Sequence, residues 1–547
     1  MRSRGLKYVI SRKQGMIALT VIAWSALIAP KMVAADPLAF FHDFTPLVQS
    51  NEAWSLQKGS VIASSDGKHA AGIVGEMLHS GVMMAVMCDQ KILGRPAPRP
   101  LIAFAPKTDQ LFRLYGQLNY FRINFPGIPV NTRVPEPISS VLFSPEGKQF
   151  AYVGKDANKR MIVHNGVVGP PMRRIDHHSI QFGKDTIAYA ASDGSTWRMI
   201  IDRFVDTDYT AVRDSLAVSP QGNTAAYLAI RDGKWHVIRD LGLSKDGKRN
   251  RLVSQGFMLA KSPVIVSDDG SVTAAWVQIQ GGIWQLAING KINEAYATTK
   301  PGNIAIRQDG KQIAAAIKSA DGRWQLIVDG KLIATCDGIG ENSLRYTQSQ
   351  KHLIAGMKWN GLWYLCVDGK LGEPSTAMMT DAYQESPNDT FLYAGRTSLG
   401  RWRVMQVDLA KNNQTVWRSS EYDGIQPGSL VISPDQQRVA FVGRYDSRAC
   451  LVVGNQMLAL RRWMGTPVFS PDSQHVAVLA SKGQQFELLI DGKSVGEPFF
   501  AVLPSAQPAW DGADEVNVVI ERQQHRFARL RVGAAHQSEE TTVSGSE

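Results

Sequence analysis

Closely spaced carboxylates are the first candidates for chemistry in this sequence. Asp206 and Asp208 are one residue apart, and Asp202 and Asp214 lie on either side of them. Oxygen ligands at such spacing are typical of calcium loops, but the central glycine and the distal glutamate of a calcium loop are missing. We therefore interpret this stretch as a solvated loop and predict no calcium site.

Two other groups contain residue types that bind metals. Met83, Met84 and Met87 precede Cys88 and form a soft set of sulfur ligands. Because alternate residues of a strand face opposite ways, this set favours core packing over one shared metal site. The pair His177-His178 has no third ligand at a suitable spacing. The sequence therefore assigns no metal-ligating residue.

The sequence gives equally little support to a catalytic nucleophile. No stretch alternates long helical and strand patterns, as the domain of a serine hydrolase would require. Ser192-Asp-Gly-Ser-Thr-Trp197 is similar to the Asp box of sialidases, but that motif has one residue between its Asp and Gly. Here Asp193 and Gly194 are adjacent, so we interpret the motif as a turn. We assign no catalytic or cofactor-binding residue and expect no cofactor.

All these residues belong to a chain that repeats about every 40 residues. Ala305–Lys331 is the clearest copy, in which apolar strands alternate with Asp-Gly turns. A period near 40 residues is that of a four-stranded propeller blade. Twelve first turns mark the repeats, at 65–67, 106–109, 144–147, 183–185, 219–222, 267–270, 308–310, 348–350, 386–389, 433–435, 470–472 and 511–512.

Two further markers recur in register with these turns. The first is a Trp that opens the third strand, at Trp197, Trp235, Trp284, Trp324, Trp363 and Trp402, with Phe486 and Phe527 in later repeats. The second is an Asn-Gly or Asp-Gly hairpin turn that closes this strand, at 165–166, 289–291, 329–331, 368–370 and 491–493. The tryptophans could form a ligand-stacking ring, but we favour packing between neighbouring blades.

The four cysteines do not predict a disulfide framework. Cys88, Cys366 and Cys450 fall in the same strand of different repeats. In a radial array these positions lie beyond the roughly 7 Å between Cα atoms that a disulfide spans. We expect buried, reduced side chains, and only Cys336 with Cys366, in neighbouring repeats, merits a check.

The first turns carry a family resemblance. Ser144-Pro-Glu-Gly147, Ser219-Pro-Gln-Gly222, Ser433-Pro-Asp435 and Ser470-Pro-Asp472, each followed by an apolar strand, resemble the WD-like propeller repeat of periplasmic TolB. The resemblance covers about residues 60 to 535 and implies a β-propeller. The chain has more repeats than the single six-bladed ring of TolB, so only the architecture carries over.

The predicted fold is an all-β propeller of about twelve four-stranded repeats. Because propellers usually have four to eight blades, we expect two tandem six-bladed rings at 36–299 and 300–535, with seven plus five as the alternative. The last repeat lacks a fourth strand, which Phe44–Leu56 could supply. Residues 536–547 are polar and are expected to form a disordered tail.

The N-terminus has the layout of a secretory signal peptide. Five basic residues precede the apolar stretch Met16–Pro30, and small residues lie near Ala35. We expect cleavage near Ala35, a periplasmic or secreted protein, and no stable membrane span in the mature chain. Without the six basic residues of 1–35, the chain has 54 Lys and Arg against 49 Asp and Glu, and these are scattered, which argues against a nucleic-acid partner.

These features favour a non-catalytic scaffold in the bacterial cell envelope. Almost the entire mature length is spent on blades, and the expected partner is an envelope protein or a glycan. The alternative is an enzyme acting on glycans or peptides whose site is built from loops at a channel mouth, because such a site leaves no local motif.

Overall fold

The computed structural model of the protein is almost entirely β-strand. It describes residues 40–534 except 51–54, 58, 79–80, 98–99, 109, 118–119, 130–131, 244–248, 280, 387, 412 and 504–505. No helix in this part of the chain is long and apolar enough to cross a membrane. The predicted signal peptide (1–35) and tail (536–547) lie outside the described residues.

The strands form twelve antiparallel sheets, which we number as blades 1 to 12. Blades 1 to 3 contain β2 (Ser55–Leu56), β3 (Ile62–Ala63), β4 (Ala70–Leu78), β5 (Gly81–Cys88) and β6 (Lys91–Ala97); β7 (Leu101–Phe104), β8 (Leu111–Gln117), β9 (Tyr120–Asn124) and β10 (Arg133–Val134); and β11 (Glu136–Pro137), β12 (Leu142–Phe143), β13 (Phe150–Asp156), β14 (Lys159–His164) and β15 (Val167–Val168).

Blades 4 to 6 include the two short 3-10 helices η1 and η2. They contain β16 (Arg174–Ile175), η1 (His177–Ser179), β17 (Gln181–Phe182), β18 (Ile187–Ser192), β19 (Trp197–Ile201) and β20 (Phe204–Val205); β21 (Thr210–Ala211), η2 (Arg213–Ser215), β22 (Ala217–Val218), β23 (Ala225–Arg231), β24 (Lys234–Leu243) and β25 (Arg249–Val253); and β26 (Leu259–Val266), β27 (Thr273–Gln278), β28 (Trp284–Ile288) and β29 (Lys291–Thr298).

Blades 7 to 9 follow the same order. They contain β30 (Lys300–Ile306), β31 (Ile313–Lys318), β32 (Trp324–Val328) and β33 (Lys331–Cys336); β34 (Gly338–Ile339), β35 (Arg345–Tyr346), β36 (Leu353–Trp359), β37 (Leu362–Val367) and β38 (Lys370–Ser375); and β39 (Ala377–Ser386), β40 (Thr390–Arg396), β41 (Trp402–Asp408) and β42 (Gln414–Arg418).

Blades 10 to 12 end the series and include the N-terminal strand. They contain β43 (Gly424–Ile425), β44 (Val431–Ile432), β45 (Val439–Tyr445), β46 (Arg448–Val453) and β47 (Gln456–Arg461); β48 (Val468–Phe469), β49 (Val476–Lys482), β50 (Gln485–Ile490) and β51 (Lys493–Phe499); and β52 (Ala501–Val502), β53 (Ala509–Asp511), β54 (Glu515–Gln523), β55 (Arg526–Ala534) and β1 (Phe40–Gln49).

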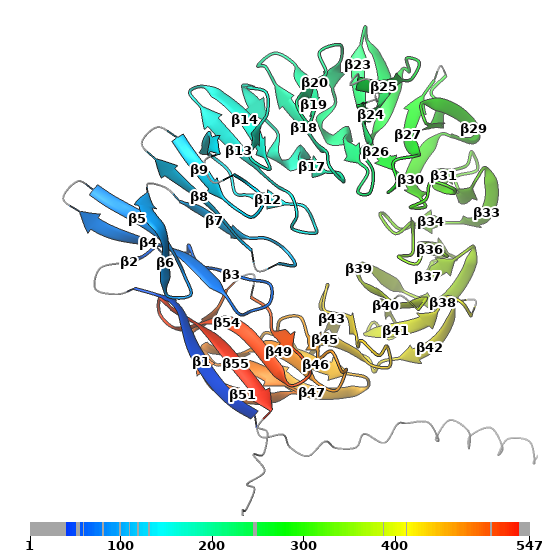
Figure 1. Ribbon diagram of the computed structural model, residues 1–547. Coiled ribbons are helices and arrows are strands. Elements are labelled where there is room, and N and C mark those ends of the chain that lie inside the picture. The colour runs from blue at the N-terminus through cyan, green and yellow to red at the C-terminus, as the bar shows by residue number, and fades with distance from the viewer. Residues whose placement is uncertain are drawn as a thin grey trace, which may run out of the picture. The chain divides into compact units, whose positions relative to one another are not determined.

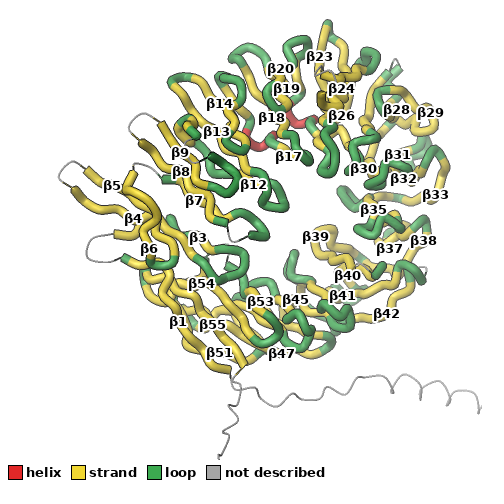
Figure 2. Tube along the Cα trace, viewed as in Figure 1, coloured by secondary structure: helices red, strands yellow, loops and turns green. Residues whose placement is uncertain are grey.

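Each blade runs from the centre of the ring to its rim. The first strands, such as β7, β30 and β39, lie at the inner edge, and fourth strands such as β33 and β42 lie at the outer edge (Figure 1). The loops alternate between the two ends of the strands (Figure 2). In seven blades the first strand is split into two short segments that pair with the same second strand. The predicted all-β propeller of twelve four-stranded repeats is confirmed.

The hairpin turn predicted between the third and fourth strands is built on two residues with positive φ. In blade 7, Asp329 has φ 47° and Gly330 has φ 78°, as a type I′ turn requires. The Asp329 carboxylate accepts the N–H of Ile313, and the Asp329 N–H donates to the Ile313 carbonyl oxygen. The same two bonds join Asp89 to Ala70, Asn165 to Phe150, Asp202 to Ile187, Asn289 to Thr273, Asp368 to Leu353 and Asp491 to Val476.

The core is divided into clusters that are shared by neighbouring blades. Between blades 6 and 7, Trp276 and Leu286 pack with Ile313 and Ile327. The joint predicted near Thr299 to Gly302 falls at this interface, where the chain continues directly into β30. Residues His42–Gly533 form one compact unit.

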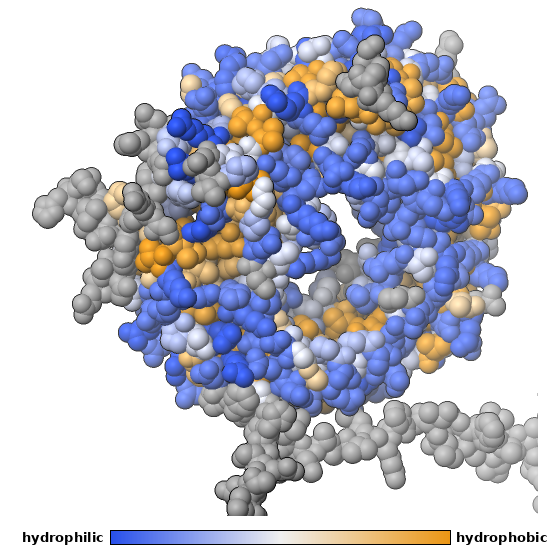
Figure 3. Space-filling view, viewed as in Figure 1, coloured by the Kyte–Doolittle hydropathy of each residue, from blue (hydrophilic) through white to orange (hydrophobic). Residues whose placement is uncertain are grey.

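The last blade packs against the first in the same way. Val519 and Phe527 of blade 12 share a core cluster with Ala70 of blade 1, and Lys68 forms a 2.6 Å ion pair with Asp511. The twelve blades therefore close into one ring, with an opening at its middle (Figure 3). The expected grouping into two tandem rings is wrong. Blades 6 and 7 share an apolar core cluster as other neighbouring blades do, and blade 12 packs against blade 1.

The first turns also connect neighbouring blades. In seven of these turns Ser or Thr accepts the N–H five residues later, as Ser470 does for His475, and this bond stabilises the turn. Turn-to-turn contacts join Lys107 to Glu146, Lys184 to Gly222, Gln221 to Asp268, Asp269 to Gln308, Gln308 to Gln350, Lys351 to Asp389, Ser386 to Gln436 and Asp435 to Ser473.

The fourth strand of blade 12 is β1, from the other end of the sequence. The predicted closing segment, Phe44–Leu56, differs in its bounds: β1 is Phe40–Gln49, and Ser55–Leu56 begins blade 1. Leu47 and Val48 are buried in the cluster between blades 12 and 1, and Arg522 lies 4.2 Å from the centre of the Phe44 ring. The ring is thus held closed by strands from both ends of the sequence.

We predict that deletion of residues 36–49 lowers the thermal unfolding midpoint by several degrees. The deletion exposes the edge of β55 and removes two buried side chains, each worth about 1.5 to 3 kcal/mol. Deletion of residues 536–547 is the matched control and should leave the midpoint unchanged. Equal midpoints for the two truncations would contradict this role of β1.

Candidate functional site

In six of the twelve blades a serine between the two short segments of the first strand fixes the same local geometry. In blade 10 the Ser429 hydroxyl accepts the N–H of Val442, the fourth residue of the second strand, at 3.1 Å. This bond satisfies a buried backbone donor that would otherwise be costly. Five other blades make it, through Ser60 and Ile73, Ser139 and Val153, Ser179 and Ala190, Ser215 and Leu228, and Ser343 and Gly356.

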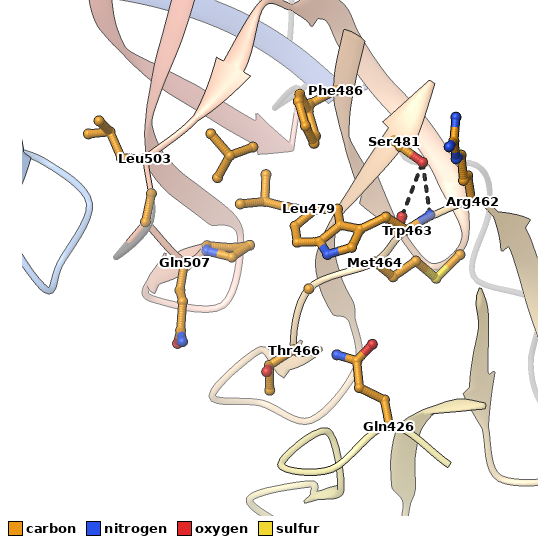
Figure 4. Close-up of a pocket in the computed structure, with 14 residues that line it drawn as sticks. Gln426, Arg462, Trp463, Met464, Thr466, Leu479, Ser481, Phe486, Leu503 and Gln507 are labelled. Atoms are coloured by element: carbon orange, nitrogen blue, oxygen red, sulfur yellow. Dashed lines mark hydrogen bonds between the residues drawn. The ribbon is translucent and has the colours of Figure 1, made fainter. Parts of the chain in front are cut away.

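Blade 11 departs from this arrangement. The residue that corresponds to Val442 is Leu479, and among the described residues no serine hydroxyl accepts its N–H. The chain between the Met464–Ala480 bridge and Ser470 is two residues shorter than its counterpart from Ile425 to Ser433. Thr466 stands at the sequence position of the serine but lies apart from Leu479 (Figure 4).

A cavity of about 710 Å³ occupies the space left by this shortened strand. Such a volume is within the usual range of ligand sites. Its lining comes from blades 10, 11 and 12 (Figure 4) and comprises Gln426, Arg462, Trp463, Met464, Gly465, Thr466, Leu479, Ser481, Phe486, Val502, Leu503, Ala506, Gln507 and Pro508. No carboxylate, imidazole or thiol is among these lining residues.

Two aromatic side chains dominate the cavity. Trp463 is 43% exposed and meets Phe486 edge to face, with ring centroids 5.7 Å apart. The backbone of Trp463 is fixed to Ser481, whose hydroxyl accepts the Trp463 N–H at 2.9 Å and whose N–H donates to the Trp463 carbonyl oxygen at 3.0 Å. The bonded backbone therefore holds a large indole at the surface. Exposure of such an apolar ring to water is unfavourable, and exposed apolar groups of this kind mark binding sites.

Polar groups stand on the other side of the indole. Gln426 and Gln507 lie across Trp463 from Phe486, and the Arg462 side chain points away from the indole (Figure 4). Arg462 is exposed and has no ion-pair partner among the described residues. An apolar wall with a polar, weakly cationic rim is an arrangement that suits binding more than acid–base chemistry.

The prediction that Asp202–Asp214 forms a solvated loop is wrong for Asp206. Asp206 is 1% exposed; it accepts hydrogen bonds from the Tyr227 hydroxyl at 2.5 Å and from Arg251 at 2.7 Å. Arg251 also binds Asp208. Asp206 was misjudged because its cationic partner lies 45 residues away in the next blade.

A second ion pair completes this network between blades 4 and 5. Arg249 donates to the fully buried Asp240 at 2.7 Å and lies 3.3 Å from Asp202. Burial raises the pKa of Asp240 despite this pairing. Asp214 is exposed in η2 and takes no part. Asp202, Asp206 and Asp208 therefore bind arginines of β25 in blade 5, and Asp240 is paired within that blade.

The remaining candidates lie in separate places. Met87 is buried between blades 12 and 1, as the strand pattern predicted, while His177 and His178 are exposed in η1. Asp193 accepts the N–H groups of Ser195 and Thr196 in the turn between β18 and β19, and these bonds lower the pKa of Asp193. Among the residues that the structure describes, no group of three or more His, Cys, Asp or Glu side chains is placed to hold a metal ion.

Five of the six repeated tryptophans pack between blades. Trp197, Trp235, Trp284, Trp324 and Trp402 are each partly buried against a cluster shared with the next blade. The four cysteines are free. Cys336 and Cys366, the pair singled out from the sequence, lie in one cluster without a disulfide, and burial raises the pKa of these thiols to about 11 and about 12.

One motif escaped the sequence analysis. Gly492-Lys-Ser494-Val-Gly496 has the spacing of a nucleophile elbow, G-x-S-x-G. In the structure Ser494 is an exposed residue of the outer strand β51, and the strand-to-helix turn that the motif requires is not present at this position. The sequence therefore matches the spacing of the motif, but the structure at this position is not a nucleophile elbow.

Trp463 and the linking serines were also missed. The serines can be found in the sequence, because each lies four or five residues before its first turn. Trp463 carries a signal too, since it lies outside the register of the other tryptophans and precedes the shortened strand. Neither signal is visible until the repeats are aligned with the strand pairing.

The fold and the cavity define a twelve-bladed β-propeller with an apolar site at one blade junction. No protein-family model and no curated protein matches the chain. Similar solved structures include a eukaryotic initiation factor, at 12% identity over 66% of this chain and 96% of that one with TM-score 0.36.

Two other solved structures are similar to the chain at low identity. TolB from Acinetobacter baumannii is 16% identical over 50% of this chain and 77% of its own, with TM-score 0.23. The computationally designed Ika8 protein is 15% identical over 59% and 97%, with TM-score 0.28. These likenesses are too distant to assign a family or a function, so the TolB-type repeat stays a prediction.

The buried network makes a prediction for two tyrosines at the same position of their blades. Tyr227→Phe should cost about 1.5 to 3 kcal/mol, because it removes a hydrogen bond to the buried Asp206 carboxylate. Tyr152→Phe is the matched control: the Tyr152 hydroxyl is buried with no hydrogen-bond partner among the described residues, so its loss should be neutral or stabilising. Thermal unfolding of both variants tests this, and equal losses would refute it.

A His–Asp pair in blade 11 gives a pH-dependent prediction. His475 lies 2.7 Å from Asp491, and this bond raises the pKa of His475. Protonated His475 therefore stabilises the fold below its ordinary pKa of about 6.5, and this contribution is lost as the pH rises through the raised value.

We expect His475→Gln to lower the unfolding midpoint at pH 5.5 more than at pH 8.5. The variant with Asp491→Asn should show the same dependence, because it removes the other partner. A midpoint difference that is the same at both pH values would contradict the stabilising role of the charged pair.

Proposed function

We propose that the protein is a non-catalytic scaffold of the bacterial cell envelope that binds a partner protein at the cavity between blades 10, 11 and 12. The signal-peptide pattern of residues 1–35 supports export, and the propeller supplies a rigid frame on which to hold a binding site. We expect the protein to act in the periplasm.

The observation that carries the proposal is the composition of the cavity. Trp463 and Phe486 form an apolar wall, Arg462 and two glutamines form the rim, and no acid–base or nucleophilic side chain is among the lining residues. Buried aromatic anchors with a surrounding polar rim are the usual energetic centre of protein interfaces. An active site would instead need groups that transfer protons or form covalent bonds.

Site-specific crosslinking in cells tests the proposal. A photocrosslinking amino acid in place of Gln507 should trap a defined partner, and Trp463→Ala should reduce that crosslink about tenfold while leaving the unfolding midpoint unchanged. Leu399 is a matched control, because it is an apolar residue, 80% exposed, in a turn between the second and third strands outside the cavity.

The controls decide the outcome. A photocrosslinking amino acid at Leu399 should not trap the same partner, and Leu399→Ala should leave the Gln507 crosslink intact. A Gln507 crosslink that survives Trp463→Ala, or no crosslink at all, would overturn the proposal. Turnover of a glycan or peptide by the purified protein would favour the enzyme instead.

A further inference from the structure

We propose that the occupant of the cavity is an extended peptide segment that carries one bulky apolar side chain next to an acidic residue. This inference rests on the proposed function and names the chemistry of the partner. Three features of the cavity support it. The Leu479 N–H has no serine hydroxyl as acceptor among the described residues, an apolar wall faces two amide side chains, and the Arg462 guanidinium has no acidic partner in the described part of the chain.

The backbone donor is the N–H of Leu479. In six other blades the corresponding N–H is directed toward the first strand and is bound by a serine hydroxyl, as Val442 is by Ser429. The local pairing is kept in blade 11, since Gly465 donates to the Leu479 carbonyl oxygen at 2.8 Å. The Leu479 N–H therefore faces the cavity where the serine would stand, and a ligand carbonyl oxygen can take its place.

The apolar wall favours a single large side chain. Trp463, Phe486 and Leu503 offer faces that a phenyl or isobutyl group can cover, and burial of such a group contributes about 1.5 to 3 kcal/mol. Gln426 and Gln507 each carry a donor and an acceptor on the opposite side. An amide is the natural complement of a peptide group, which also has one donor and one acceptor per residue.

The same lining disfavours a glycan as the main ligand. Sugar hydroxyls all carry donors, and the strong acceptors for them, carboxylates, are not among the lining residues. The rim instead carries the guanidinium of Arg462, which has no acidic partner in the described part of the chain. A neighbouring Asp or Glu of the peptide would supply one, so charge complementarity favours an acidic flank.

Fluorescence anisotropy with the purified full-length chain tests this inference. The probes are labelled, capped hexapeptides of the form Ser-Glu-X-Ser-Gly-Ser, in which X is Phe, Leu or Ala, and a second set with Lys in place of Glu. We expect the Phe and Leu peptides to bind at least tenfold more tightly than the Ala peptide. We also expect the Glu set to bind several-fold more tightly than the Lys set, with the difference lost in Arg462→Ala.

Two loop grafts test the missing serine directly. Replacing Gly465-Thr466 with Gln-Pro-Gly-Ser, the loop of blade 10, should restore the hydroxyl, fill the cavity and abolish binding. The graft Gln-Pro-Gly-Ala has the same length without the hydroxyl, and its lower unfolding midpoint should show that the serine bond was formed. Trp463→Ala should weaken binding about tenfold, and Leu399→Ala should not.

The outcomes separate this inference from the proposed function. Absence of peptide binding at 1 mM, binding that ignores the residue X, or tighter binding of maltoheptaose or chitotetraose than of the peptides would overturn the peptide inference. If the Gln507 crosslink in cells still depends on Trp463 in that case, the scaffold function stands with a different ligand. Loss of both results would reject the two together.

Discussion

Closure of the ring is the constraint on which the rest of the structure depends. Each blade buries the two faces of its sheet only against its neighbours, in clusters such as the one that joins Leu286 of blade 6 to Ile327 of blade 7. An open arc would leave an apolar face exposed at each end. Val48 and Phe527 show how this is avoided, because β1 and β55 bring the two ends of the sequence into one sheet against blade 1.

The repeats, the turns and the tryptophan packing could be predicted from the sequence because their causes are local. Asp329-Gly330 specifies a turn by its backbone preferences alone, and the alternation of β32 fixes which way Trp324 faces. The number of blades in one ring could not be predicted, since it depends on small angles between sheets that no single repeat encodes. The two-ring expectation relied on the usual size of propellers and not on a property of residues 299 to 302.

The site was harder to predict than the fold. Asp206 was assigned to solvent because Arg251 lies in another blade, so the ion pair has no trace in the local sequence. The cavity was missed because it results from a deletion: the first strand of blade 11 is two residues shorter than that of blade 10 and lacks its serine. In a repeat protein, function is often found where one copy departs from a pattern that other copies share, and Trp463 lies beside such a departure in blade 11.

The most direct test of the account is an electron cryomicroscopy image of the purified protein viewed along the ring axis. The account predicts class averages of one closed ring with twelve blades, in which the blade that contains β1 and β55 adjoins blade 1. Two smaller rings joined by a linker, or an open arc with a gap between blades 12 and 1, would contradict it.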